Sequence, residues 1–343
     1  MRAMSGRPEQ RSRDTGVAPD PAPATSRRTL HRLLCGAFVF VVVAAVTSTT
    51  GRASHTAQPT RFAVGLRVIR LIDRTRTIRL PSGKTEPRRL LTYVRYPALG
   101  RASAYDLAGA PAARSAGPFP LIVFGHGYAV TPAVYSRLLR AWTHAGYVVA
   151  APVFPLESAN APGGPDETDL VNEPADVRFV ITQLVAASAS ATGPLSGIID
   201  PRRIAVAGHS DGGEAALAVA YDSRFRDPRI RAAIILSGAA IPYRRFRVPR
   251  ASPPLLATQG SADTINPPTF TRDFYDIALP PKFLLILTGA AHLPPYSYQQ
   301  PQLGIVERVT LAFLDQYLSE TGSLHRLVMA GTVPGIARLT ADP

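Results

Sequence analysis

The sequence predicts an α/β protein built on a mostly parallel, doubly wound sheet that is flanked by helices. Short, continuous apolar runs such as residues 121–124 recur along the chain, and such runs are typical of strands buried on both faces. Segments with helical periodicity separate these runs, which favours parallel strands joined by crossover helices. The connections are too short for a large cap domain, so we expect a site that is open to solvent.

Each expected element has its own local pattern. Residues 64–72 and 89–96 alternate or cluster like two strands, and the turn-forming residues 81–84 join them. One helix begins at Pro132, where proline suits the first turn, and residues 303–318 carry an amphipathic apolar stripe. The expected strands are residues 64–72, 89–96, 121–124, 147–154, 204–207, 232–236, 255–259 and 283–287. The expected helices are residues 132–145, 175–191, 215–220, 268–277 and 303–318, and the pattern after Gly322 is ambiguous.

Length and composition are consistent with a single large domain, and the composition argues against nucleic-acid binding. With 343 residues, 46% of them hydrophobic, the chain can bury a large core, and we expect residues 58–343 to form a single domain. The formal charge is +14, but the basic residues are almost all arginines and are scattered without interleaved aromatics. The dense cluster Arg244, Arg245, Arg247 and Arg250 is expected in an exposed loop, with contact to an anionic surface as the alternative.

Residues 1–57 are expected to be a disordered N-terminus followed by a targeting segment. The paired Arg27 and Arg28 loosely resemble a twin-arginine export signal. They precede an apolar run at residues 33–46, whose length fits a signal peptide and is short for a membrane span. We therefore expect a secreted or extracytoplasmic protein, cleaved between Gly51 and Gln58. An uncleaved anchor formed by residues 33–46 stays open as the alternative.

The cysteine and motif content excludes several kinds of site. Cys35, the single cysteine, lies within the targeting segment, so the mature domain is expected to have no disulfide, cysteine nucleophile or cysteine metal ligand. The sequence has neither a metal-binding histidine motif nor a glycine-rich nucleotide loop. We therefore expect no metal and no cofactor.

The pentapeptide Gly-His-Ser-Asp-Gly at residues 208–212 predicts a nucleophile elbow. It lies between an expected strand and an expected helix, which is the context that a G-x-S-x-G elbow requires. A sharp turn at Ser210 crowds the positions two residues before and after it, which explains why both are glycine. Ser210 is thus the expected nucleophile. A glycine-rich turn with an incidental serine is the alternative.

Two further residues complete the expected triad. Asp263 follows the strand expected at residues 255–259, and His292 follows the strand expected at residues 283–287. A serine hydroxyl needs a base to take its proton, and the base needs an acid to orient it. The order Ser210, Asp263, His292 is the one found on this kind of sheet, and the coincidence of three residues at three strand ends argues against an incidental serine.

Two backbone N–H groups are expected to form an oxyanion hole. One belongs to Asp211, directly after the nucleophile, and the other to Tyr128, where Gly127 permits close approach. His126 is an alternative base, but its position in this loop favours a structural role. His209 is expected to pack under the elbow.

These residues resemble the α/β-hydrolase family. The likeness covers about residues 89–318 and rests on four motifs. They are Pro-Leu-Ile-Val-Phe-Gly-His-Gly-Tyr at 120–128, the elbow motif at 200–213, Gly-Ser-Ala-Asp-Thr-Ile-Asn-Pro-Pro at 260–268 and Gly-Ala-Ala-His at 289–292. Within the family the chain is similar to dienelactone hydrolases, chlorophyllases, platelet-activating-factor acetylhydrolases and cutinase-like polyester hydrolases. Unlike the polyester hydrolases, it has Asp211 where they usually carry methionine, and no cysteine for their C-terminal disulfide.

The resemblance implies a cofactor-free carboxylic-ester hydrolase with the triad Ser210, Asp263 and His292. The expected partner is a small-molecule or lipid ester, and a monomer is expected. A peptidase on the same fold and a non-catalytic envelope or binding protein are the alternatives. The Asp211 carboxylate is expected to face solvent, with pairing to a cationic substrate group as the sharper alternative. Residues 154–165 and 242–249 are expected near the mouth of the site.

Overall fold

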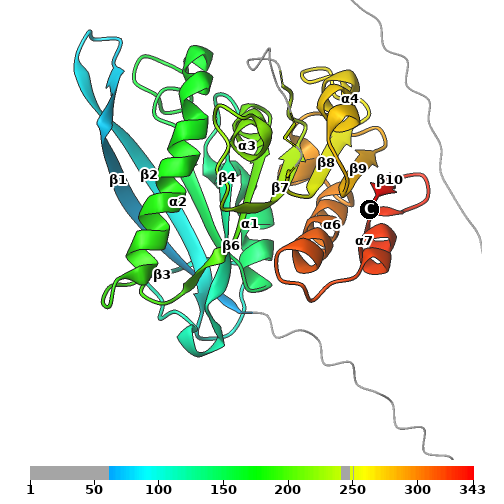
Figure 1. The fold of residues 1–343 in the computed structure, drawn as a ribbon, viewed down its shortest axis with the longest axis horizontal. Helices are drawn as coiled ribbons and strands as arrows, with labels where there is room; N and C mark the ends of the chain where they lie inside the picture. Colours follow the sequence, from blue (N-terminus) through cyan, green and yellow to red (C-terminus); the bar gives the residue numbers. More distant parts are fainter. Residues whose placement is uncertain (1–61, 241–247, 250) are drawn as a thin grey trace, which may run out of the picture. The chain divides into compact units, whose positions relative to one another are not determined.

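A ten-stranded sheet runs through the centre of the fold (Figure 1). The structure is a computed structural model that describes residues 62–240, 248–249 and 251–343. The expectations for the targeting segment, for Cys35 and for the arginine cluster at residues 244–250 fall on residues outside these ranges. The described residues belong to one compact unit, Thr56–Pro343. Within them, none of the helices combines the length and apolar character needed to span a membrane.

The strands confirm the expected doubly wound, mostly parallel sheet. Their order is β10-β9-β8-β7-β6-β4-β5-β2-β1-β3. The six central strands from β5 to β9 are parallel, whereas β2 pairs antiparallel with β5 and β1, and β10 pairs antiparallel with β9. The strand bounds are β1 Ala63–Arg79, β2 Thr85–Ala98, β3 Leu107–Ala108, β4 Phe119–Gly125, β5 Val148–Val153, β6 Ile199–His209, β7 Ile230–Leu236, β8 Leu255–Gly260, β9 Lys282–Leu287 and β10 Ala337–Asp342.

Helices cover both faces of the sheet, as Figure 1 shows. They are α1 Ser136–His144, α2 Glu173–Ala189, α3 Asp211–Tyr221, α4 Pro268–Ile277, α5 Pro294–Ser297, α6 Gln302–Tyr317 and α7 Leu324–Gly331, with 3-10 helices at Arg114–Ala116, Pro132–Tyr135 and Glu167–Asn172. Strand β4 serves both layers because successive side chains point to opposite faces. Leu121 and Val123 pack in the layer that contains α2, α3 and α4, and Ile122 and Phe124 pack in the layer of α1 and α6.

The strand order places a ligand site at the ends of β4 and β6. The chain leaves β4 to form β5 on one side and later returns to form β6 on the other, so the winding direction reverses there. Ligands of such sheets bind at this switch point, beyond the carboxyl ends of the strands. The expected oxyanion loop follows β4 and the expected nucleophile follows β6, so the topology brings them to one place.

The structure adds elements that the sequence pattern did not indicate. The ambiguous segment after Gly322 forms helix α7 and strand β10, and β10 closes one edge of the sheet against β9. The expected helix at residues 132–145 begins as a 3-10 turn before α1. The hairpin of β1 and β2 is longer than expected, because its partly exposed ends continue to pair across the turn at residues 81–84.

A buried arginine ties this hairpin to α2. Arg88 is 2% exposed and forms paired hydrogen bonds to Asp169 at 2.9 and 2.6 Å and to Asp176 at 2.7 and 2.6 Å. Burial alone would lower the pKa of Arg88, but the two carboxylates outweigh it and raise that pKa above its ordinary value. Arg88 therefore compensates the charge of both buried aspartates, and Arg76 adds a second ion pair to Asp176 at 2.6 Å.

Replacing Arg88 by methionine is expected to lower the free energy of unfolding by about 3–5 kcal/mol, because it leaves buried Asp169 without a cation and buried Asp176 with Arg76 as its remaining ion-pair partner. Urea denaturation followed by circular dichroism measures this loss. The neighbouring Arg89 is exposed on the same strand, so Arg89→Met is the matched control and should cost about 0.5 kcal/mol or less. Equal losses in the two variants would contradict the buried ion-pair account.

Candidate active site

Ser210 occupies a strained turn between β6 and α3. Its backbone has φ 54° and ψ −125°, outside the conformations that a serine ordinarily adopts. The flanking glycines are required by close backbone contacts: a Cβ on Gly208 would lie 2.0 Å from the Gly212 carbonyl oxygen. A Cβ on Gly212 would lie 2.2 Å from the carbonyl carbon of Gly125. The elbow therefore has the crowding that its sequence indicates.

The structure brings Ser210, His292 and Asp263 together from the ends of three strands. The His292 Nε2 lies 2.9 Å from the Ser210 Oγ, and its Nδ1 lies 2.8 Å from the Asp263 Oδ2. All three residues are buried, with His292 8% exposed. The histidine ring can thus accept the serine proton at one nitrogen while the carboxylate fixes the other nitrogen as the donor.

Asp263 is held as a carboxylate by its surroundings. Its Oδ1 accepts hydrogen bonds from the backbone N–H groups of Ile265 and Asn266, each at 3.0 Å, and its Oδ2 accepts one from the Gln259 side chain. Burial acts to raise the pKa of Asp263, but the hydrogen bond and charge of His292 and these backbone donors lower it overall. The acid therefore stays ionised and keeps its hold on His292.

His209 lies beneath the elbow and supports the backbone at His292. Its Nδ1 is 2.8 Å from the Tyr135 hydroxyl, and its Nε2 is 2.9 Å from the carbonyl oxygen of His292. Since that carbonyl can only accept, the Nε2 carries the hydrogen and the Nδ1 accepts from Tyr135. Burial lowers the pKa of His209 to about 3, so the ring is neutral at neutral pH. This arrangement agrees with a packing role.

His126 is fully engaged in ordering its own loop. Its Nε2 accepts a hydrogen bond from the Phe154 N–H at 3.0 Å, so its Nδ1 donates to the Gly127 carbonyl oxygen at 2.9 Å. Burial lowers the pKa of His126 to about 4. Neither nitrogen is free to accept a proton from Ser210, so the geometry favours the structural role over the alternative of His126 as the base.

The loop that carries Tyr128 is fastened to the loop after β5. The Ala129 N–H donates to the Glu157 carbonyl oxygen at 3.0 Å, and the Tyr128 hydroxyl donates to the Pro165 carbonyl oxygen at 3.1 Å. A Cβ on Gly127 would lie 3.0 Å from the Ser210 Cβ, so the loop passes close to the nucleophile. The Gly127 N–H already donates to the Tyr135 hydroxyl. The assignment of the Tyr128 and Asp211 N–H groups as the oxyanion hole stays a prediction.

The Asp211 side chain is buried, and the expectation that it faces solvent is wrong. The residue is 6% exposed, and its Oδ1 accepts a hydrogen bond from the Ser210 Oγ at 3.3 Å. Carboxyl groups of Glu157, from the loop after β5, and Glu173, from α2, lie near it. Its Oδ2 is closed to solvent and lacks a hydrogen-bond partner, which also argues against pairing with a cationic substrate group.

The structure adds three buried carboxyl groups to this region that the sequence analysis missed. Glu157 and Glu173 lie in a stretch that looks like a polar surface loop, but both are 0% exposed. Glu214 is 5% exposed on α3, whose other residues are all buried as well. A lone glutamate in an otherwise small and apolar helix is the sequence signal that could have identified the cluster.

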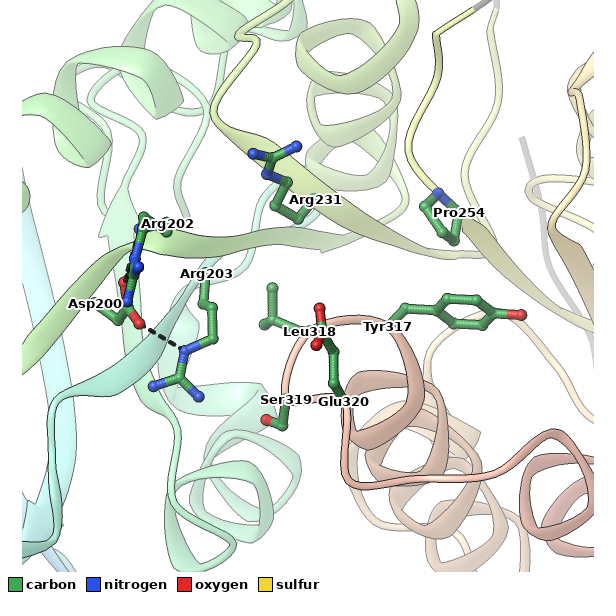
Figure 2. Close-up of a pocket in the computed structure, with 9 residues that line it drawn as sticks. All are labelled: Asp200, Arg202, Arg203, Arg231, Pro254, Tyr317, Leu318, Ser319 and Glu320. Carbon is green, nitrogen blue, oxygen red and sulfur yellow. Dashed lines mark hydrogen bonds and ion pairs between the residues drawn. The ribbon is translucent and has the colours of Figure 1, made fainter.

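The described residues contain no group of three or more histidine, cysteine or acidic side chains arranged to hold a metal ion. A cavity of about 680 Å³ lies at the other edge of the sheet, near the amino ends of β6, β7 and β8 (Figure 2). Its lining includes Arg203, which bonds to Asp200 at 2.8 Å, and Arg231. Since Ser210 and His292 follow the carboxyl ends of β6 and β9, this cavity is separate from the triad.

Comparison with known proteins agrees with the fold and with an ester-hydrolysing role. Residues 108–238 match the protein family described as Chlorophyllase, a stretch that includes Tyr128 and Ser210 and ends before Asp263. A solved ferulic acid esterase from Streptomyces cinnamoneus is similar in fold, with a TM-score of 0.59 and 22% sequence identity. The likeness covers 78% of this chain and 94% of that chain. The comparison with curated protein sequences gives no match.

The solved structure shares the fold alone at this level of identity, whereas the family match also covers the elbow and the loop after β4. Together these findings identify the chain as an ester hydrolase of the α/β-hydrolase fold.

Proposed function

We propose that the protein is a serine carboxylic-ester hydrolase that works through the triad Ser210, His292 and Asp263. The observation that carries the proposal is the position of His292, with one ring nitrogen 2.9 Å from the serine hydroxyl and the other 2.8 Å from the carboxylate. An intact set of this kind favours an enzyme over a non-catalytic binding protein, because a binding site does not need a base in contact with a serine.

The proposed reaction has two steps. The Ser210 Oγ attacks the ester carbonyl carbon while the His292 Nε2 takes the hydroxyl proton, and the protonated His292 then gives that proton to the leaving alcohol. The negative charge on the carbonyl oxygen is stabilised by the N–H groups of Tyr128 and Asp211. Water, deprotonated by His292, then attacks the acyl-enzyme. The acid is released and the Ser210 hydroxyl is restored.

The proposed substrate is a small-molecule or lipid ester that reaches Ser210 without a cap domain to cross. We also propose that the protein is exported or held at the outer side of a membrane. This part rests on the paired Arg27 and Arg28 and on the apolar run at residues 33–46. We further propose that the protein acts as a monomer, because one chain supplies all three triad residues.

The proposal predicts that a fluorophosphonate probe labels the protein at Ser210 and that Ser210→Ala abolishes both labelling and ester hydrolysis. p-Nitrophenyl acetate, butyrate, octanoate and palmitate measure the hydrolysis and give the preferred acyl length. Circular dichroism checks that the variant is folded. If the folded wild-type protein neither hydrolyses these esters nor reacts with the probe, the serine-hydrolase proposal is wrong and the binding-protein alternative is favoured.

A further inference from the structure

Four carboxyl groups gather behind the nucleophile, and among the residues that the structure describes none of them forms an ion pair with a cation. Glu157 comes from the loop after β5, Glu173 from the start of α2, and Asp211 and Glu214 from the first turn of α3. All four residues are nine-tenths or more buried. Arg88, the buried cation nearest to α2 in the hydrogen-bond network, is already bound by Asp169 and Asp176. Four carboxylates in such a place would repel one another and lack solvation.

The oxygen atoms of this cluster lack donors. In the described part of the chain, eight buried side-chain nitrogen and oxygen atoms have no hydrogen-bond partner, and five of them belong to Glu157, Glu173 and Asp211. The Glu157 carboxyl group is nevertheless within hydrogen-bonding reach of both Glu173 and Asp211. Two carboxylates cannot bond to each other, whereas a carboxylic acid donates one hydrogen bond to a carboxylate. The contacts of Glu157 with Glu173 and Asp211 become hydrogen bonds if some of these carboxyl groups are protonated.

The surroundings also indicate which groups hold those protons. Asp211 lies at the N-terminus of α3, where the helix dipole favours a negative charge, and its Oδ1 accepts from Ser210. Burial raises the pKa of Glu157 to about 8 and that of Glu214 to about 9, and burial also raises the pKa of Glu173 well above its ordinary value. The order is then a neutral Glu173 donating to a neutral Glu157, which donates to the Asp211 carboxylate.

This chain ends at the reacting hydroxyl. The single Ser210 proton has two acceptors in reach, His292 Nε2 at 2.9 Å and Asp211 Oδ1 at 3.3 Å, and only the bond to His292 leads to reaction. A carboxylate that already accepts a hydrogen bond from an acid is a weaker acceptor for the serine. Glu157 also fastens the oxyanion loop, since its carbonyl oxygen accepts from the Ala129 N–H at 3.0 Å.

We propose that Glu157 is a positioning residue of the ester-hydrolysing site: as a neutral acid it donates a hydrogen bond to Asp211, so that the Ser210 proton stays with His292. Loss of the Glu157 proton strengthens Asp211 as a competing acceptor. It also adds a second negative charge behind the developing oxyanion. Both effects slow acylation, so activity falls on the alkaline side. This inference rests on the serine-hydrolase function proposed above.

Within the described residues, the charged and titratable groups around Glu157 come from five elements. They are Asp211 and Glu214 on α3, Glu173 and Asp176 on α2, Glu167 and Asp169 on the 3-10 helix before α2, Arg88 on β2 and Arg76 on β1. Because the charge on each carboxyl group changes the pKa of its neighbours, the cluster titrates as a unit. The expected alkaline decline therefore belongs to the cluster, to which Glu157 contributes one of the protons.

The first test is a pH profile of kcat/KM for wild type and Glu157→Gln. Glutamine keeps the shape and an N–H donor for Asp211 but cannot ionise. We expect wild-type activity to fall as the pH rises through about 8, since burial raises the pKa of Glu157 to about 8. In Glu157→Gln, activity at pH 7 should stay within about threefold of wild type, and the decline should move up by about one pH unit. Glu86→Gln, at a partly exposed glutamate that pairs with Lys84 instead of with the cluster, is the matched control and should leave the profile unchanged. An unchanged profile in Glu157→Gln would overturn the proposal.

The second test removes the donor. Glu157→Met keeps the volume but donates no hydrogen bond, and we expect kcat/KM at pH 7 to fall about tenfold or more, in line with losing one hydrogen bond to a charged group. Equal activities of the methionine and glutamine variants would show that Glu157 only fills space. If the methionine variant does not fold, the pH profile of Glu157→Gln still decides.

The third test does not depend on activity. Infrared difference spectra between pH 7 and pH 10 should show a protonated carboxylic-acid band in wild type at pH 7, part of which is missing in Glu157→Gln. This measurement separates the two proposals, because Ser210→Ala should keep the band while losing hydrolysis. Absence of a Glu157-dependent band would overturn the inference and leave the serine-hydrolase function standing. A Glu157-dependent band together with no ester hydrolysis by the wild-type protein would mean that Glu157 is protonated but that the serine-hydrolase function is wrong.

Discussion

His292→Ala is expected to lower kcat/KM for p-nitrophenyl esters by about 10⁴- to 10⁶-fold while leaving the protein folded. Of the two acceptors within reach of the Ser210 Oγ, His292 Nε2 at 2.9 Å and Asp211 Oδ1 at 3.3 Å, the imidazole is the stronger base, and the water that would replace it is far weaker. Removing Ser210 in the same variant should add little further loss, because the two residues act as a unit. Steady-state hydrolysis of p-nitrophenyl acetate measures both effects.

The matched control for this variant is His325→Ala. His325 is exposed on α7, outside the triad, and its loss should change activity by less than about twofold. Retention of activity within tenfold in His292→Ala would mean that another group takes the serine proton. His126 and His209 are poorly placed for that role, since hydrogen bonds occupy both ring nitrogens of each.

Gly208→Ala is expected to lower the free energy of unfolding by about 4 kcal/mol or more, or to prevent folding. The new Cβ would lie 2.0 Å from the Gly212 carbonyl oxygen and 2.7 Å from the Gly213 nitrogen, and backbone atoms on both sides of the turn cannot move apart without opening the elbow. Urea denaturation measures the loss, and fluorophosphonate labelling shows whether the surviving fraction keeps a reactive serine.

Gly304→Ala provides the contrast. Gly304 lies in α6, and the nearest atom to its added Cβ is the flexible Gln300 side-chain oxygen at 3.1 Å. Alanine favours a helix over glycine by about 0.5–1 kcal/mol, so this variant should be as stable as wild type or more stable. If both alanine variants were equally stable, close packing at the elbow would not be what requires glycine there.

The central strands could be predicted from the sequence because their signal is local. A strand buried on both faces must be apolar at every position, and the runs in β4, β6, β7 and β9 meet that condition without reference to the rest of the chain. The signal for the elbow is equally local, since the glycines two residues before and after Ser210 indicate the crowding at the turn. The order of the acid and the base along the chain then follows from the direction of the sheet.

The features that could not be predicted depend on contacts between distant segments. Strand β10 is mostly exposed and pairs with β9 along one side, so its own pattern carries little information. Asp211 is buried beside Glu157 and Glu173, which lie in the loop after β5 and at the start of α2. That stretch is rich in polar residues and is therefore typical of a surface loop, and its inward-facing carboxyl groups become evident only when α2 packs beside α3.

The separation of the triad along the chain affects how the protein is made. The nucleophile leaves the ribosome 82 residues before the base, and the loop that carries the base gains its Thr288-to-Ile336 backbone hydrogen bond only when the segment before β10 has emerged. Until then β9 exposes an unpaired edge. A nascent chain interrupted before His292 therefore carries a serine without its proton acceptor. A chain interrupted between His292 and Ala337 has all three triad residues but leaves the β9 edge unpaired, so it is prone to associate through that edge.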